Sequence, residues 1–433
     1  MQRFLHAHAT HPDWRVALAL AAAQLDAQAD TQQREAAGGA LAPTLGWVYL
    51  TDHYAAHTEN LLAELRQRWP GVAWVGATCV GICASGVEYF DEGALVLMLA
   101  AIPAAHFRVF SGARPLGDFA AHTALVHADP ATADLAELIH EMGRRTTSGY
   151  LFGGLASARS GCRHIADSAL SGGLSGVAFD RDVALVSRVT QGCQPVGPTR
   201  EVTAVDRNVV IELDGRSALD CLLRDVQLEG REPREALPRL RQILVGLSDP
   251  SEMPEAASPR SASAELGGSA SHATVRGAFG ADVRVRHLIG IDSGRRGIAI
   301  GDVAETGTRL AFCSRNTEAA RRDLVRICAE VREEVESEFE PAFEPRLPAP
   351  GRSERIEAGT LPRPSGIAGA VYVSCAGRGG PHFGAASAEL ALVRHALGDV
   401  PLVGFFAAGE IAHQNLYGYT GVLTVFRHAP IGA

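Results

Sequence analysis

The sequence predicts a mixed α/β (α+β) protein with two related domains, in which mixed or antiparallel sheets are flanked by helices. Two observations support this prediction. Short runs rich in β-branched and aromatic residues alternate with segments whose apolar residues recur every three or four positions. One β-α-β-turn-β pattern also occurs twice, once near each end of the chain. A length of 433 residues favours more than one domain.

The duplication becomes visible when the chain is aligned with itself at a shift of 328 residues, which places Gly404 against Gly76. Eleven identities fall within 38 aligned positions. Residues 73–87 read AWVGATCVGICASGV, and residues 401–415 read PLVGFFAAGEIAHQN. Both stretches place a second glycine five residues after the first, at Gly81 and Gly409. Glycines at a strand end permit a tight turn and a close approach of backbone, so the repeated phrase predicts a repeated structural unit.

Each copy reads as a strand, an amphipathic helix, a short buried strand, a glycine turn and a further strand. The helices stop at Pro-Gly in the first copy and at Gly-Asp in the second. The predicted elements are 46–50, 57–71, 72–76 and 93–99 in the first copy, and 369–374, 387–399, 400–404 and 421–426 in the second.

The region between the two copies predicts further strands and two helices, at 217–227 and 318–339. A boundary near 215–225 divides the chain into domains at 1–218 and 219–433. Two segments rich in Pro, Ser and Ala lack periodicity and are predicted to be flexible insertions in the second domain, at 248–272 and 340–366.

Composition excludes several classes of function. The formal net charge of −9 argues against a nucleic-acid-binding protein, and no apolar run is long enough to span a membrane. All 40 basic residues are arginine, so a P-loop lysine and a lysine Schiff base are excluded. Eight scattered cysteines without a C-x-x-C motif predict reduced thiols in the cytoplasm.

Several motifs taken in order resemble the FIST family, in which a FIST N domain is followed by a FIST C domain. GATCVGICASG, LFGGLAS and VRHLIGIDSGRRGIAIGD are similar to stretches of the N domain, and SCAGRG and PLVGFFAAGEIAH are similar to stretches of the C domain. The similarity extends over about 400 residues. It implies a small-ligand sensory module, with amino acids or related metabolites as ligands and with no reaction. The chain shows no fused effector domain, so any output partner is expected to be a separate signalling protein.

Arg378 and Glu410 are the strongest candidates for ligand contacts. Arg378 lies in a glycine-flanked loop after a strand, where a guanidinium can bind a carboxylate or phosphate. Glu410 follows a glycine turn, where a carboxylate can bind an ammonium group. Together they suit an amino-acid-like zwitterion. The alternative is a structural ion pair for each of them. The first copy has Ile82 in place of Glu410, so only the second copy can supply this carboxylate.

The other candidate ligand-binding residues lie in the glycine turns or in motifs expected to line a pocket between the domains. Cys375 lies beside Arg378 and Cys79 lies in the first glycine turn, and each is either reactive or a buried, inert thiol. The full set of candidates beside Arg378 and Glu410 is Gly404, Gly409, Cys375, Gly76, Gly81, Cys79, Arg286 and Asp167.

Two other classes of function remain as alternatives. The first is an enzyme that uses Cys375 or a bound metal, and the second is a protein-interaction scaffold. No catalytic residue, cofactor or metal ligand is assigned, because His53 and His57, and the HAHATH stretch at 6–11, lack the spacing of a known metal site. The sequence predicts neither the ligand nor the oligomeric state.

Overall fold

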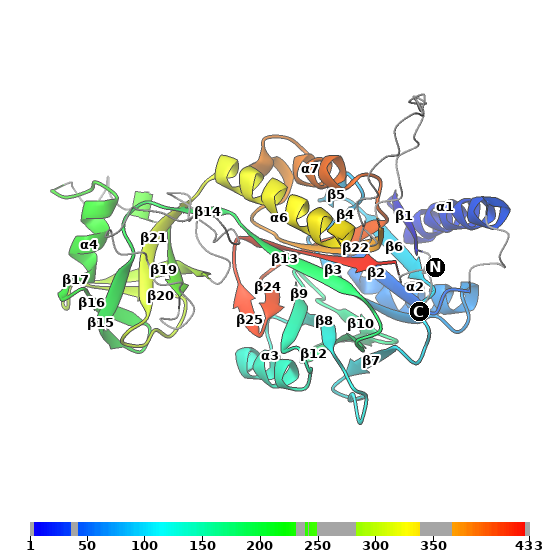
Figure 1. Cartoon of the computed structure of the whole chain (residues 1–433), viewed down its shortest axis with the longest axis horizontal. Coiled ribbons are helices and arrows are strands. Elements are labelled where there is room, and N and C mark those ends of the chain that lie inside the picture. Colours follow the sequence, from blue (N-terminus) through cyan, green and yellow to red (C-terminus); the bar gives the residue numbers. More distant parts are fainter. Residues whose placement is uncertain are drawn as a thin grey trace, which may run out of the picture. The chain divides into compact units, whose positions relative to one another are not determined.

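The structure is a computed structural model that describes residues 4–35, 42–230, 239–240, 242–248, 283–337 and 366–428. The predicted insertions at 248–272 and 340–366 lie almost entirely outside the described residues. The fold is mixed α+β, as predicted (Figure 1). The chain divides into two compact units. The first unit contains residues 1–190, 324–416 and 420–433, and the second contains residues 191–323 and 417–419.

Three sheets of the first unit share one design. In each sheet a central strand lies parallel to one neighbour and antiparallel to the other. The first sheet has the order β1 (Phe4–Thr10), β6 (Ala94–Ala100), β2 (Leu45–Thr51), β3 (Ala73–Cys79), β10 (His164–Ala166) and β11 (Ala169–Leu170). The second has the order β25 (Asn415–Tyr417), β24 (Glu410–His413), β9 (Tyr150–Leu155), β8 (Thr123–Ala128), β12 (Leu174–Phe179) and β7 (Phe107–Ser111). The third has the order β13 (Leu185–Gln191), β26 (Thr420–Arg427), β22 (Ile367–Cys375), β23 (Leu402–Ala407), β4 (Gly81–Ala84) and β5 (Val87–Phe90).

A helix connects the two parallel strands of each sheet, because parallel neighbours need a crossover connection. These helices are α2 (Thr58–Arg68), α3 (Leu135–Arg144) and α7 (Ala388–Leu397). The short 3₁₀ segments η1 (Asp52–His57) and η3 (Gly380–Phe383) precede α2 and α7. Two longer helices, α1 (Trp14–Glu35) and α6 (Thr317–Ser337), precede β2 and β22. Leu61, Leu62 and Leu65 of α2 are buried at the spacing that the sequence predicted.

The unit of the duplication therefore occurs three times. The first repeat comprises β1–β6, the second β7–β12, and the third β13 with α6 and β22–β26. The structure confirms the two copies found in the sequence and adds the middle one, which sequence comparison missed. In the third repeat, residues 192–316 lie between β13 and α6, and nearly all of the second unit is formed by this insertion.

All three repeats have a glycine at the same place in the second parallel strand, and the reason is steric. A Cβ atom on Gly76, Gly153 or Gly404 would lie 1.7, 2.0 or 1.8 Å from the carbonyl oxygen of the facing residue on the parallel neighbour. Only glycine avoids this overlap, because its backbone can approach the adjacent strand without a side chain. We call these three residues the tight glycines, and one of them lies in the second parallel strand of each repeat.

Each repeat also extends its hairpin into the sheet of another repeat. Cys83 of β4 lies opposite Gly404, Ile165 of β10 lies opposite Gly76, and Ile411 of β24 lies opposite Gly153. The first repeat thereby joins the third sheet, the second joins the first sheet, and the third joins the second sheet. This exchange is cyclic, so the N-terminal and C-terminal parts of the chain fold as one interlocked unit.

The second unit is an antiparallel β-structure that includes helix α4 (Ala218–Asp225). Its strands follow the order β14 (Cys193–Pro195), β21 (Arg309–Arg315), β15 (Arg200–Asp206), β16 (Val209–Leu213), β20 (Gly297–Ile300), β19 (Arg284–Asp292) and β18 (Ile243–Ser248), with β17 (Arg216–Ser217) beside β16. Because β18 also pairs with β21, the strands close into a ring. Apolar residues of α4 and the strands, including Leu222, Val245 and Phe312, form its core.

Candidate functional site

Arg378 lies in the turn after β22 and is 1% exposed. Its Nε and Nη2 atoms donate hydrogen bonds of 3.0 and 2.8 Å to Oε1 of Glu389. Its Nη1 atom donates a longer bond, of 3.3 Å, to the backbone carbonyl of Thr190 at the end of β13. The guanidinium carbon also lies 5.3 Å from the centre of the Phe383 ring. Arg378 is therefore fixed at the junction of β22, β13 and α7.

Glu389 supplies the carboxylate of this ion pair from the first turn of α7 and is fully buried. It also accepts a hydrogen bond of 2.8 Å from the hydroxyl of Tyr372 and bonds of 3.1 and 3.0 Å from the hydroxyl of Ser374. Sequence reasoning missed Glu389. The available signal was its position in the buried stripe of α7 with Leu390 and Val393, because a charge in an apolar stripe needs a partner.

Glu410, the first residue of β24, is fully buried as well. Its Oε2 atom accepts hydrogen bonds from the backbone N–H and the hydroxyl of Thr420, at 3.0 and 2.7 Å. Its Oε1 atom has no N–H or O–H donor within hydrogen-bonding distance among the described residues. Burial raises the pKa of Glu410 to about 7, although the bonds from Thr420, the charge of Arg378 and the thiol of Cys375 oppose this shift.

A third carboxylate, that of Glu88 on β5, reaches this region from the first repeat. It accepts hydrogen bonds from the backbone N–H groups of Gly380 at 3.0 Å and of Leu390 at 3.4 Å. Burial raises the pKa of Glu88 to about 7, and the nearby charge of Glu389 adds to that shift. The exchanged hairpin of the first repeat is thus fastened to η3 and α7.

We call the buried and half-buried side chains around Arg378 the polar cluster. It comprises Thr190, Tyr372, Ser374, Cys375, Arg378, Glu389, Glu410 and Thr420, all of which belong to the first unit. Thr190 contributes a second buried atom without a hydrogen-bond partner among the described residues, its hydroxyl Oγ1. The polar cluster therefore contains one arginine and two glutamates, and two of its oxygens, Oε1 of Glu410 and Oγ1 of Thr190, have no hydrogen-bond partner among the described residues.

The first repeat has apolar or aromatic residues at the positions that carry these charges in the third. In the aligned repeats, Leu61 of α2 corresponds to Glu389 and Ile82 corresponds to Glu410. Ile82 and Glu410 each directly precede the residue that faces the tight glycine of another repeat. Tyr54 corresponds to Arg378, because each is buried and lies three residues after the first parallel strand ends. Leu61 and Ile82 are fully buried.

The remaining predicted residues divide between the two units. Gly76 and Gly404 serve the close strand contacts, while Gly81 packs its backbone against Phe90 and Gly409 packs against Leu416. Cys375 is half-buried in the polar cluster. Two predicted residues form ion pairs elsewhere. Asp167 binds Arg114 at 2.7 Å in the first unit, and Arg286 binds Asp302 at 2.8 Å in the second.

Cys79 lies at the end of β3 and is fully buried. Burial raises the pKa of its thiol well above the ordinary value. A thiol in this setting remains protonated near neutral pH and is a poor nucleophile.

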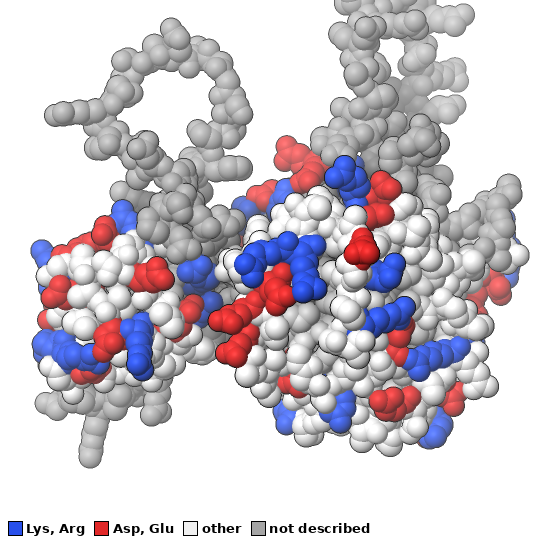
Figure 2. All heavy atoms as spheres, turned by 90° about the horizontal axis from the view of Figure 1, so that it is seen from below, with Lys and Arg blue, Asp and Glu red and all other residues white. Residues whose placement is uncertain are grey.

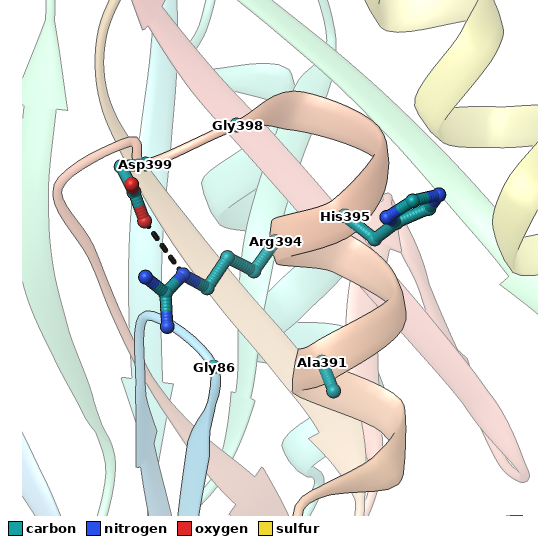
Figure 3. A pocket seen from close by; sticks show the side chains of 6 residues that line it. All are labelled: Gly86, Ala391, Arg394, His395, Gly398 and Asp399. Carbon is teal, nitrogen blue, oxygen red and sulfur yellow. Dashed lines mark hydrogen bonds and ion pairs between the residues drawn. The ribbon is translucent and has the colours of Figure 1, made fainter.

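An open cavity of about 410 Å³ lies along α7 from Ala391 to the end of the helix, beside the turn of the β4–β5 hairpin (Figure 3). Its lining residues are Gly86, Ala391, Arg394, His395, Gly398 and Asp399. Arg394 extends across the hairpin turn and binds Asp399 through Nε at 2.6 Å. The cavity and the polar cluster are therefore built on the same helix and the same hairpin.

The surface of the molecule lacks a broad field of one charge on the face that Figure 2 draws, where acidic and basic side chains are interspersed. Within the described part of the chain, no helix has both the length and the apolar character needed to cross a membrane.

The architecture is that of a two-part α+β protein with a buried polar cluster in its first unit. The FIST N domain model matches residues 44–216, and the FIST C domain model matches residues 218–413. The chain therefore belongs to the FIST family, as the sequence motifs predicted. The stretch VRHLIGIDSGRRGIAIGD at 285–302, which was expected in the N domain, instead lies within the C domain match. FIST domains are associated with the sensing of small ligands in signal transduction.

The chain is similar to mycobacterial proteins over almost its whole length. An uncharacterized protein of Mycobacterium tuberculosis is 31% identical over 437 residues, which cover 96% of this chain and 97% of the relative. An uncharacterized protein of Mycobacterium bovis is 30% identical over 425 residues, which cover 94% of this chain and 96% of the relative. The similarity therefore extends over both of the regions that the two FIST models match in this chain.

Proposed function

We propose that this protein is a stand-alone sensor that binds a small amino-acid-like zwitterion at the polar cluster and signals through a separate protein. The observation that carries the proposal is the difference between the repeats. The third repeat buries Arg378, Glu389 and Glu410 at positions where the first repeat buries Tyr54, Leu61 and Ile82.

The energetic argument starts from the cost of burying charge. Removing an ion pair from water is expensive, and replacing it with packed apolar groups is often neutral or stabilising. The first repeat builds the same strand order and helix without buried charges at these positions. The fold alone therefore does not require the polar cluster, and a binding role accounts for its presence.

The unpartnered oxygens indicate the chemistry of the ligand. An ammonium group beside Oε1 of Glu410 would supply the donor that this atom lacks, and it would favour the ionised carboxylate. A ligand carboxylate would bind Arg378 in competition with the carbonyl of Thr190. The hydrogen bond from Arg378 to Thr190, at 3.3 Å, is longer than its bonds of 3.0 and 2.8 Å to Glu389. Both polar ends of an amino acid would then be matched by opposite charges.

Binding at a buried cluster requires movement, which suits a sensor. Arg378 and Glu410 are at most 1% exposed, so a ligand reaches them only in a more open state of the first unit. A ligand that binds one state better shifts the population toward that state. Arg378 holds Thr190, the last residue before the second unit, and Glu410 holds Thr420, the first residue after the segment 417–419. The cluster therefore contacts two points where the chain crosses between units.

The second unit holds the neighbouring residue Tyr419 firmly. The Tyr419 hydroxyl and Nε2 of His287 are 2.9 Å apart, and the guanidinium carbon of Arg315 lies 3.8 Å from the centre of the tyrosine ring. Tyr419 directly precedes Thr420 in the chain. A change at Glu410 that moves Thr420 would therefore act on the segment 417–419, which the second unit holds at Tyr419. We propose this segment as the route by which the bound state reaches the second unit.

A thermal-shift screen of the full chain tests the proposal. The panel contains amino acids, their decarboxylated amines and their deaminated carboxylic acids, so that the contribution of each charge is measured separately. A ligand at about 100 times its Kd should add roughly 2.7 kcal/mol to the free energy of unfolding. We expect a response to an amino acid that weakens when either charge is absent.

Two variants locate the site in the same assay. Glutamine has the shape of glutamate without its charge. The Glu410→Gln variant should therefore lose the part of the thermal shift that depends on the ligand's ammonium group. Arg394→Gln, which changes the open cavity along α7, is the matched control and should retain the response. A response that survives in Glu410→Gln and disappears in Arg394→Gln would move the site to the cavity. Silence across the panel would favour a protein-interaction scaffold.

A further inference from the structure

A second group of convergent side chains, none of which belongs to the polar cluster, lies at the start of β7 and the end of β12. His106 directly precedes β7, and Asp180 directly follows β12. These two strands are adjacent and antiparallel, with Phe107 opposite Phe179, so the strand register brings the two residues together (Figure 1). Asp182 follows two residues later, in the turn after β12.

The three side chains point their ligand atoms at one another. Nδ1 of His106 lies 2.8 Å from Oδ2 of Asp180 and 3.5 Å from Oδ2 of Asp182. One ligand atom from each residue lies within 4.8 Å of the other two. Among the residues that the structure describes, no other group of three or more histidine, cysteine or acidic side chains meets this spacing.

The backbone holds the three groups in this arrangement. The N–H of Asp180 donates to the carbonyl of His106 at 3.1 Å, which fixes the two segments against each other. Oδ1 of Asp180 accepts the N–H of Asp182 at 3.0 Å, so Oδ2 of Asp180 remains directed toward the histidine. The imidazole is partly exposed, with 32% of its side-chain surface accessible, so water can complete a coordination shell.

We propose that His106, Asp180 and Asp182 form a binding site for a divalent transition-metal ion such as Zn²⁺. One imidazole nitrogen and two carboxylate oxygens are a ligand set found in sites for zinc, manganese and iron, with the remaining positions taken by water. The histidine favours these ions over Mg²⁺, which prefers oxygen ligands alone. The site is separate from the polar cluster and does not depend on the sensor proposal.

The signal for this site is absent from the sequence, because 74 positions separate His106 from Asp180. The histidines that the sequence did single out have other surroundings. His8 contacts the hydroxyl of Tyr89 at 2.6 Å, and the ring of His57 packs against Trp14 with 6.1 Å between centroids. Only strand pairing brings His106 to its carboxylates.

Isothermal titration calorimetry of metal-free full-length protein with Zn²⁺ tests the proposal. We expect Zn²⁺ binding that becomes at least about tenfold weaker in His106→Gln and in Asp182→Asn. Asp182 is 65% exposed at its side chain, so its substitution should leave the fold intact. His140→Gln and Asp118→Asn change exposed residues of the same types elsewhere in this unit and should bind Zn²⁺ like the unmodified chain.

A thermal-shift measurement separates metal binding from a structural role for the three residues. Zn²⁺ should raise the melting temperature of the unmodified chain and of both controls, and should raise it less in His106→Gln and Asp182→Asn. The proposal is overturned if the unmodified chain binds no Zn²⁺, or if both site variants bind it with unchanged affinity.

Discussion

The first and third repeats have the same strand order, the same parallel pair and the same tight glycine, yet their interiors differ in kind. The first repeat fills the space between its helix and sheet with Tyr54, Leu61 and neighbouring apolar residues. The third fills it with Arg378 and Glu389, joined by bonds of 2.8 and 3.0 Å. One architecture thus supports either an apolar core or a charged one.

Removing one partner of the Arg378–Glu389 ion pair should have the largest effect on the difference between the first and third repeats. Glu389→Ala leaves Arg378 buried without its carboxylate, so the free energy of unfolding should fall by about 3–5 kcal/mol. Urea unfolding followed by circular dichroism measures this loss. Glu59→Ala is the matched control, since Glu59 lies in the first turn of α2 but is exposed, and it should change stability by less than about 0.5 kcal/mol. Equal effects of the two substitutions would contradict the buried ion pair.

The shared glycine tests what the repeats have in common. Gly404→Ala and Gly76→Ala each place a Cβ against a carbonyl oxygen at 1.8 or 1.7 Å, so the paired strands must separate. Each should reduce the free energy of unfolding by about 3 kcal/mol or more. Gly112→Ala is the control, because its added methyl group would meet no atom within 4 Å beyond its immediate chain neighbours. A large effect in only one repeat would show that the strand contact is not equivalent in the two.

The dependence of stability on pH tests Glu410. Its folded pKa of about 7 lies above the ordinary 4.5, so the folded state binds the proton more tightly than the unfolded state. This contribution to stability is fully present below about pH 4.5 and is lost as the pH rises through 7. At pH 8 the cost of ionising the buried carboxyl should reach roughly 3 kcal/mol.

Glu410→Gln removes that titration. The stability of the variant relative to the unmodified chain should therefore rise between pH 4.5 and 8, as measured by urea unfolding at each pH. Glu88, whose pKa is also about 7, titrates in both proteins, so its contribution cancels in the difference. A constant difference across this range would rule out a raised pKa at Glu410.

Replacing the three charged residues of the third repeat with their counterparts from the first repeat tests directly whether the fold needs the buried charges. The triple variant Arg378→Tyr, Glu389→Leu and Glu410→Ile should fold, with a free energy of unfolding within about 2 kcal/mol of the unmodified chain. It should lose any response to the sensed ligand in the thermal-shift assay. An unfolded or strongly destabilised protein would instead indicate that the charges maintain the fold.

Cys375 should give the smallest effect. Thr51 occupies the corresponding position in the first repeat, since both residues end the first parallel strand opposite its parallel neighbour. Cys375→Thr should therefore change stability by less than about 1 kcal/mol and leave ligand binding intact. Complete loss of function in this variant, with the fold and stability retained, would favour an enzyme that uses the thiol.

The sequence by itself determined the family, the first and third repeats and the main elements within them, but not α3 (Leu135–Arg144) of the middle repeat. Apolar periodicity located α2 and α7, β-branched runs located β2 and β22, and the glycine phrase exposed the duplication because a steric conflict with the facing carbonyl preserves it. Arg378 and Glu410 were also visible, since charged residues in glycine turns after buried strands are uncommon in an apolar setting.

Only the tertiary structure decided which groups meet. Side-chain direction along α7 pairs Arg378 with Glu389, and strand pairing places His106 beside Asp180. The middle repeat escaped sequence comparison because it keeps the pairing pattern and Gly153 but few other shared residues. Local propensity depends on neighbours in sequence, whereas the hairpin exchange and the polar cluster depend on residues hundreds of positions apart, so only the folded chain defines them.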